Sequence, residues 1–100
     1  MAARTITLRI LTPAGLVLED EATSIVAPGE VGYLGILRNH APLVTTLVPG
    51  QLRWKRAGGE RTSRRIGAGL LEVARNRVVV LTDSIDADGD AASSEKLRVS

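Results

Sequence analysis

Turn signals divide this chain into short segments, and their spacing limits the folds that it can adopt. Gly and Pro residues recur roughly every eight to twelve residues, for example at residues 13–15, 28–29, 49–50 and 58–59. The segments between them alternate in polarity or are continuously apolar, and none has the periodicity of an amphipathic helix. The pattern therefore predicts an all-β fold, a sandwich or barrel built from short strands.

The apolar segments between the turn signals give the expected strands. The charged triplet 19–21 is expected to end one short strand, and residues 78–82 are expected to be buried on both faces or at the core of a sandwich. Residues 29–42, with glycines at 29, 32 and 35, are expected to form a rigid surface connection between strands. The predicted strands are residues 5–11, 16–18, 23–27, 43–48, 51–57, 61–66, 70–74 and 78–82.

The hairpin between residues 51–57 and 61–66 allows two registers. A two-residue turn would set arginines opposite one another and put Ile66 on the face opposite Trp54. A three-residue loop of residues 58–60 with a bulge returns both side chains to one face. We therefore favour the three-residue loop.

Composition narrows the class of protein. A chain of 100 residues that is 44% hydrophobic forms one domain, and with only Tyr33 and Trp54 as aromatics its core must be aliphatic. The formal net charge of +2 gives no strong field toward nucleic acid or anionic lipid, and the absence of cysteine excludes disulfides and thiolate metal sites. The sequence has no run long enough to span a bilayer and no secretory signal, so we expect a soluble cytoplasmic protein.

Residues able to carry out catalysis or hold a cofactor are scarce. His40, the single histidine, would have to pair with Ser24, Ser63 or Ser84, and none of these lies in a nucleophile motif. Residues 67–72 resemble the start of a dinucleotide fingerprint but have Glu where the third glycine belongs, so a tight strand connection is favoured. Residues 86–90 resemble the start of a calcium loop, yet the bidentate Glu is missing. We expect no cofactor and no metal.

A basic hairpin suggests one alternative function. Six Lys and Arg residues but only one acidic residue, Glu60, lie between residues 53 and 65. Such a surface could bind nucleic acid in the manner of a small β-barrel, although Trp54 is the only aromatic nearby. A charged hairpin is also how sheets protect exposed edges.

Three segments in order resemble the N-terminal domain of the epsilon subunit of F-type ATP synthases. Residues 12–21, leading to Val-Ala-Pro-Gly at 26–29, resemble the opening strands of that family. Residues 32–43 are similar to its Gly-x-x-Gly-x-x-x-x-His-x-Pro signature, and residues 67–83 to its Gly-Gly-x-x-Glu-Val and Asn-x-Val-x-Val-Leu pattern. Each motif alone is weak evidence for the resemblance, but the three motifs together and in this order are specific to the family.

The resemblance implies a flattened β-sandwich of about ten strands that takes no part in catalysis. It implies a place in the central stalk, bound to the gamma subunit and to the polar loops of the c-ring, in a hetero-oligomeric complex peripheral to the cytoplasmic face of the bacterial plasma membrane. Neither membrane insertion nor nucleic-acid binding is expected. The partner-binding residues that it implies are Glu30, Gly32, Tyr33, Leu34, Gly35, Arg38, Asn39, His40, Ala41 and Pro42.

Two departures from the family pattern bear on function. Tyr33 stands where many relatives carry a polar or acidic residue, and Arg38 where many carry Pro, so the polarity of the ring contact is altered. The family's C-terminal pair of helices, which can bind nucleotide or inhibit hydrolysis, has no counterpart here, because residues 85–100 are acidic and poor in apolar side chains. We expect a sandwich domain at residues 1–84, a flexible acidic tail at 85–100, and no ATP site.

Overall fold

The computed structural model describes residues 5–86, which form eight strands and, within that range, no helix. The all-β prediction is confirmed. Hydrogen bonding joins the strands in the order β1-β8-β7-β4-β2-β5-β6, with β3 on β2 and a further pairing of β1 with β2. The strands are β1 (Ile6–Thr12), β2 (Gly15–Gly29), β3 (Gly32–Leu37), β4 (Leu43–Leu47), β5 (Gly50–Arg56), β6 (Arg61–Ile66), β7 (Gly69–Ala74) and β8 (Arg77–Thr82).

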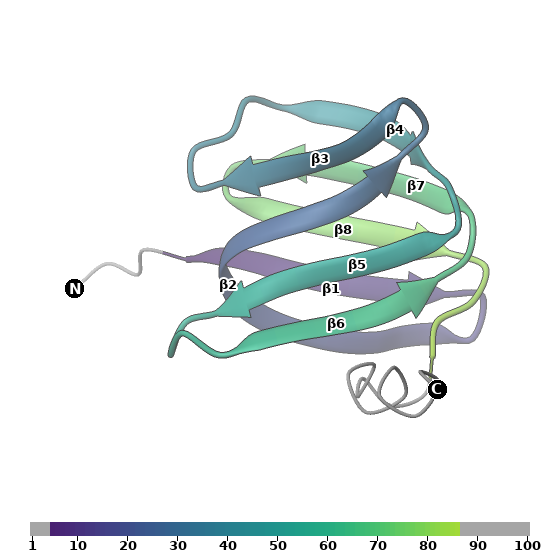
Figure 1. The fold of residues 1–100 in the computed structure, drawn as a ribbon, viewed down its shortest axis with the longest axis horizontal. Helices are drawn as coiled ribbons and strands as arrows, with labels where there is room; N and C mark the ends of the chain where they lie inside the picture. Colours follow the sequence, from purple (N-terminus) through teal and green to yellow (C-terminus); the bar gives the residue numbers. More distant parts are fainter. Residues whose placement is uncertain (1–4, 87–100) are drawn as a thin grey trace, which may run out of the picture.

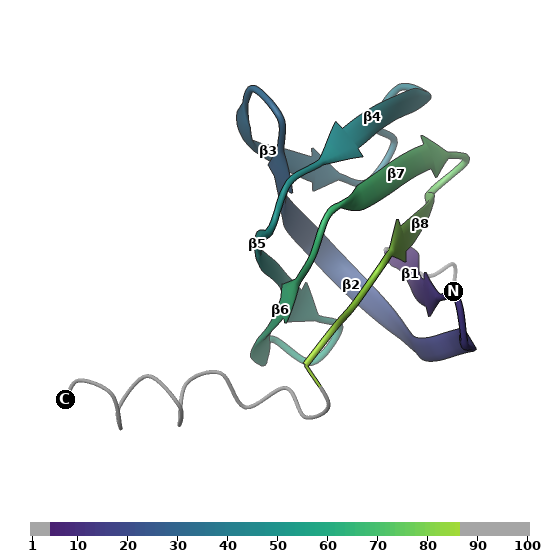
Figure 2. The ribbon, with the colours of Figure 1, turned by 90° about the vertical axis from the view of Figure 1, so that its right-hand side faces the viewer.

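The strands form two layers that face one another (Figures 1 and 2). One layer contains β3, β2, β5 and β6, and the other contains β4, β7, β8 and β1. The long strand β2 joins them, because its first half pairs with β1 and its second half with β3 and β5. A sheet that curls onto itself in this way is a β-sandwich with barrel character.

The length of β2 corrects the sequence-based prediction of two separate strands. Its 15 residues run without a break through the charged triplet that was expected to end the first of them. Pairing on both sides holds the triplet extended: Glu21 lies opposite Thr7 of β1, and the neighbouring Ala22 lies opposite Arg56 of β5. Irregular registers at Ile10/Leu11 and at Ala22/Ser24 let the strand bend from one layer into the other. Two predicted strands thus merge into β2, and residues 5–86 form eight strands in all.

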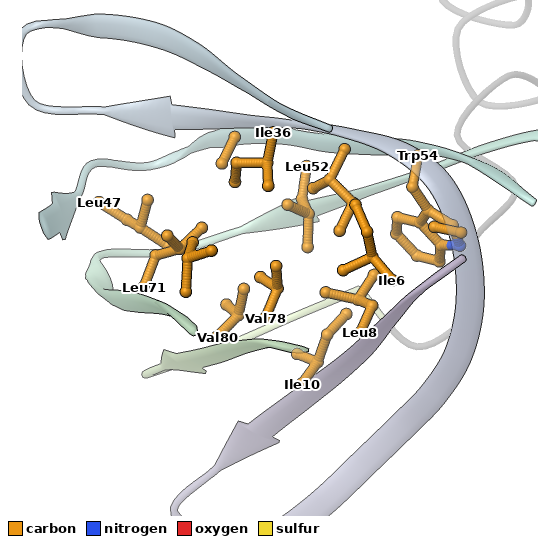
Figure 3. Packing of buried hydrophobic residues seen from close by; sticks show 14 of the residues in the cluster. Ile6, Leu8, Ile10, Ile36, Leu47, Leu52, Trp54, Leu71, Val78 and Val80 are labelled. Carbon is orange, nitrogen blue, oxygen red and sulfur yellow. The ribbon is translucent and has the colours of Figure 1, made fainter. Parts of the chain in front are cut away.

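The core lies between the two layers and is aliphatic apart from Trp54, as the composition predicts (Figure 3). Val78 and Val80 of β8 are fully buried, but Leu81 is 47% exposed, so this strand is buried on one face only. Of the two predictions for β8, the sandwich core is the correct one. The buried apolar residues are Ile6, Leu8, Ile10, Ala22, Ile25, Ala27, Ile36, Leu47, Leu52, Trp54, Ile66, Leu71, Val73, Val78 and Val80.

The β5–β6 hairpin has the predicted loop length but a different position. Lys55 lies opposite Arg61 and Gly50 opposite Ile66, so the loop is residues 57–59 and the register is shifted by two. The two-residue turn is wrong, and like charges still face one another. Gly59, at φ 99°, supplies the positive φ that the last position of a three-residue loop requires. In the predicted loop that position would have fallen on Glu60.

After β8 the chain passes alongside β6. Ile85 forms a bridge with Ile66 and packs against the core, and the amide of Asp86 donates to the carbonyl of Arg65 at 3.1 Å. The domain boundary at residue 84 remains a prediction. The acidic tail and the residues that resemble a calcium loop lie, beyond Asp86, outside the described residues.

Candidate protein-interaction surfaces

The stretch 29–42 is not a simple connection, because six of its residues form strand β3. Its inward residues Leu34 and Ile36 pair with Ala27 and Ile25 of β2, and Ile36 is fully buried. The sequence did not predict this strand, because the glycines interrupt its alternation of inward and outward side chains. Gly32, at φ 137°, closes the tight β2–β3 turn, a conformation that residues with a Cβ rarely adopt.

The candidate contact residues divide between the two ends of β3. Glu30 and Tyr33 lie at the β2–β3 turn, whereas the loop 38–42 follows the other end of the strand (Figure 1). A strand of six residues separates the two groups by roughly 20 Å. Leu34 differs from the rest because it packs against the hydrophobic core. The structure therefore does not bring the candidates into one patch.

The loop 38–42 is fixed to the β7–β8 turn by two asparagines. Asn39 and Asn76 both have positive φ, 68° and 60°, which Asn tolerates better than other side chains. The amide of Asn39 donates to Oδ1 of Asn76 at 2.6 Å, and Nδ2 of Asn76 donates to Oδ1 of Asn39 at 3.2 Å. The carbonyl of Asn76 also accepts from the amide of Thr7 at 3.0 Å. Asn76, which sequence reasoning missed, thus holds β1, β8 and the loop together.

Replacing Asn76 with Gly should isolate this side-chain clamp, because Gly keeps the positive φ of the turn. We expect the free energy of unfolding to fall by about 1 to 2 kcal/mol, measured by urea denaturation, since two hydrogen bonds are lost. Arg75→Gly, at the neighbouring position with φ 52°, is the matched control and should be neutral or slightly stabilising. Equal losses in the two variants would show that the turn and not the clamp matters.

His40 presents a defined hydrogen-bonding group to solvent. Its Nδ1 lies 2.7 Å from the carbonyl oxygen of Ala41, and because a carbonyl only accepts, Nδ1 carries the proton. Nε2 is the ring nitrogen that this bond leaves for contact with a partner. Of the candidate nucleophiles, Ser24 lies on β2, Ser63 on β6 and Ser84 just after β8, and no hydrogen bond within residues 5–86 joins any of them to His40.

Tyr33 lies on the outer face of the layer that contains β3, β2, β5 and β6. It pairs with Pro28, is 56% exposed, and has the guanidinium of Arg53 at 5.7 Å from its ring centroid. This distance is typical of a cation–π contact. An exposed aromatic ring held by a neighbouring strand is a suitable anchor for a partner protein.

The same outer face carries four cations, Arg53, Lys55, Arg61 and Arg65, which we call the basic face. Strand pairing places Arg53 opposite Ser63, Lys55 opposite Arg61, and Gln51 opposite Arg65. A shallow groove of about 660 Å³ lies between β2, β5 and β6 beside these side chains. The basic face follows from the sequence pattern, but its groove does not.

The other basic residues of the hairpin, and its tryptophan, do not contribute to this face. Nε of Arg56 pairs with Asp20 at 2.9 Å, and Arg64 donates to the carbonyl of Asp86 at 3.0 Å. Trp54 is only 3% exposed, and its Nε1 donates to Oδ2 of Asp20 at 2.8 Å. The buried ring of Trp54 therefore cannot serve as a stacking platform for nucleic acid.

On the other layer, leucines form an exposed row. Leu70 lies opposite Leu81, Leu81 opposite Leu11, and Leu11 opposite Leu16, so the row crosses β7, β8, β1 and β2. Leu70, Leu81 and Leu16 are 45%, 47% and 49% exposed. Contiguous exposed apolar side chains of this kind mark protein interfaces. Sequence reasoning missed this leucine row because it depends on the parallel pairing of β1 with β8.

Two further features limit the kind of site. Within residues 5–86 there is no group of three or more His, Asp or Glu side chains that could hold a metal ion. The part of the chain that the structure describes also has no helix with the length and apolar character to cross a bilayer. The geometry defines a β-sandwich whose distinctive surfaces are suited to contact with other proteins.

Comparison with known proteins identifies the family. The model of the ATP synthase delta/epsilon chain β-sandwich domain matches residues 5–87. The ATP synthase epsilon chain of Anaeromyxobacter sp. (strain Fw109-5) is 45% identical over 85 residues, covering 85% of this chain and 64% of the relative. That of Desulforamulus reducens is 44% identical over 100 residues, covering 96% of this chain and 75% of the relative. The chain belongs to the ATP synthase delta/epsilon β-sandwich family.

Solved structures show the same fold. A chain of the Euglena gracilis mitochondrial ATP synthase (OSCP/F1/c-ring) gives a TM-score of 0.80 at 22% identity, covering 97% of this chain and 63% of that one. A chain of the Tetrahymena thermophila mitochondrial ATP synthase (central stalk/c-ring) gives a TM-score of 0.67 at 16% identity. The match covers 86% of this chain and 69% of that one. The chain thus spans less than two thirds of the length of the Anaeromyxobacter relative and of the Euglena chain.

Proposed function

We propose that the chain is the epsilon-type central-stalk subunit of an F-type ATP synthase, a non-catalytic protein that joins the gamma subunit to the c-ring. The family match over residues 5–87 carries the proposal. The names of the similar proteins support it, because the bacterial relatives are called epsilon chains and the structures with the same fold contain central stalk or c-ring. Such a subunit transmits rotation by staying bound at both ends.

The leucine row is the surface we assign to the gamma subunit. A coupling contact must survive torque, and permanent interfaces are more apolar than transient ones. The leucine row is an exposed apolar surface that continues across four strands in register. Burying one exposed leucine contributes roughly 1 kcal/mol or more, so several together give a stable contact.

We assign two separate contacts, one at each end of β3, to the polar loops of the c-ring. Tyr33 and Arg53 supply an aromatic ring and a cation, whereas the loop 38–42 supplies Nε2 of His40 and the side chain of Asn39. A contact of this composition is polar and directional, and it fits c-ring loops that carry carboxylates. Such a contact requires neither a nucleotide nor a metal.

The location follows from the complex. The named relatives are bacterial epsilon chains, so we place the protein at the cytoplasmic face of the bacterial plasma membrane, held there through its partners. The division into a sandwich at residues 1–84 and an acidic tail is part of the same proposal.

Co-elution with the cognate gamma subunit on a sizing column tests the proposal. We expect a stoichiometric complex that persists at moderate salt. Leu81→Lys should abolish it, because a charge would enter the apolar contact. Ala57→Lys, at the exposed tip of the β5–β6 hairpin, is the matched control and should leave co-elution intact. Absence of any complex with the unaltered chain would overturn the assignment.

Tyr33→Ala tests the second contact. If Tyr33 is an anchor at the ring, its loss should weaken binding to a purified complex of gamma and c-ring by roughly 30-fold, the effect of a hot-spot residue. The measurement is a titration of labelled chain by fluorescence anisotropy. Ala57→Lys, at the exposed tip of the β5–β6 hairpin, is again the control and should change the affinity little. Unchanged affinity in Tyr33→Ala would remove Tyr33 from the site.

A further inference from the structure

The groove of the basic face is lined by side chains from three neighbouring strands, β2, β5 and β6. Residues that lie directly opposite one another on antiparallel strands project from the same face, so strand pairing arranges these side chains in two rows. The first row is Ser24, Lys55 and Arg61, and the second row is Val26, Arg53 and Ser63. The groove, of about 660 Å³, thus contains three cations and two serine hydroxyls.

The charges of these three cations are not compensated within residues 5–86. Arg53, Lys55 and Arg61 are all exposed, and the ion pairs in this part of the chain involve none of them. Glu60, the acid next to Arg61 in the sequence, pairs with Arg56 instead, at 3.4 Å. Lys55 lies directly opposite Arg61, and like charges in that position destabilise a sheet. A bound anion would relieve this repulsion.

Protection of a sheet edge explains only part of this charge. β6 is the last strand in the sheet order, and cations on such an edge strand deter pairing with another chain. Arg53 and Lys55, however, lie on β5, which pairs with β2 on one side and with β6 on the other (Figure 1). A strand that is paired on both sides has no edge to protect. The cations of β5 therefore need another explanation.

We propose that the groove binds a soluble phosphate compound, with a phosphate group between Lys55 and Arg61. A phosphate group carries a charge of about −1.5 to −2 and three acceptor oxygens, so it satisfies more of these donors than one carboxylate would. The planar guanidinium of Arg61 suits bidentate bonding to phosphate, and Ser24 and Ser63 supply hydroxyls beside it. A hollow between strands suits a small ligand better than a flat bilayer surface. The inference does not depend on the proposed function.

Titration of the full chain with inorganic pyrophosphate, followed by amide NMR shifts at constant ionic strength, tests the proposal. We expect saturable shifts at residues 53–55 and 61–63. Arg61→Gln should weaken binding roughly tenfold, because it removes a charge-assisted contact. Arg77→Gln removes an exposed cation from β8 in the other layer, so it is the matched control and should leave the affinity unchanged. Shifts that do not saturate, or equal affinities in the two variants, would overturn the proposal.

Two further measurements separate phosphate binding from other causes. Without pyrophosphate, Arg61→Gln should be at least as stable to urea as the unaltered chain, because it removes the repulsion with Lys55. A loss of stability would give Arg61 a structural role and contradict the proposal. Hexaglutamate, and vesicles of equal parts phosphatidylcholine and phosphatidylglycerol, should each bind at least about tenfold more weakly than pyrophosphate. Equal binding of hexaglutamate would identify an acidic protein segment as the occupant, and equal binding of the vesicles an anionic lipid surface. Either result would overturn the proposal.

Discussion

We expect Gly69→Ala to destabilise the domain strongly. Among the glycines at strand ends, Gly69 is the one where replacement by Ala should lower the free energy of unfolding most. A Cβ at Gly69 would overlap the backbone carbonyl of Leu81 and lie 2.8 Å from Cα of Thr82, so β8 would have to move away from β7. Overpacking costs roughly 1 to 3 kcal/mol, and a clash with backbone, which cannot rotate away, falls at the upper end of that range. The urea midpoint should fall accordingly, with fluorescence of Trp54, the single tryptophan, as the probe.

Gly35→Ala is the matched control for this prediction. A Cβ at Gly35 meets nothing within 4 Å, and the residue lies in a strand interior, where Ala is at least as stable as Gly. Its urea midpoint should therefore equal or exceed that of the unaltered chain. Similar midpoints for the Gly69 and Gly35 variants would contradict the close approach of β7 and β8.

Asp20→Ala is expected to have the second largest effect. Its Oδ2 accepts from the buried indole Nε1 of Trp54 at 2.8 Å and pairs with Nε of Arg56 at 2.9 Å. Removal leaves the indole N–H buried without its acceptor, which costs about 1 to 3 kcal/mol. We expect a loss of about 2 kcal/mol in the free energy of unfolding, again from urea denaturation.

Arg56→Ala separates the two contacts of Asp20. The Arg56 side chain is 45% exposed, so its ion pair is screened by solvent and contributes less than about 1 kcal/mol. The Arg56 variant should therefore lose less than half as much stability as the Asp20 variant. Equal losses would mean that the ion pair, and not the hydrogen bond to Trp54, fixes β2 against β5.

The architecture could be predicted because the hydrophobic pattern and the turn residues agree along most of the chain. The alternation in β1 and the continuous apolar run of β8 both predict strands, and the structure has them. The continuity of β2 could not be predicted, since charged residues usually end a strand. Here Glu21 instead accepts hydrogen bonds from the hydroxyls of Thr5 and Thr7, and Asp20 accepts one from Trp54.

The surfaces were harder to predict because they depend on pairings between distant parts of the chain. The sequence motif correctly drew attention to residues 29–42, but its alternating residues are a strand, and its two ends lie apart. The clamp between Asn39 and Asn76 joins residues 37 positions apart, so no local sequence pattern predicts it. The leucine row likewise needs β1 beside β8, a parallel pairing that hydrophobic periodicity does not specify.

We propose that this chain joins the gamma subunit to the c-ring, and reconstitution tests this role most directly. Catalytic head with gamma, prepared without this chain, would be added to membrane vesicles containing the c-ring, and ATP-driven proton uptake would be followed by fluorescence quenching. We predict little uptake without the chain, recovery when it is added in stoichiometric amount, and no recovery with Leu81→Lys. Equal proton uptake with and without the chain would contradict the account.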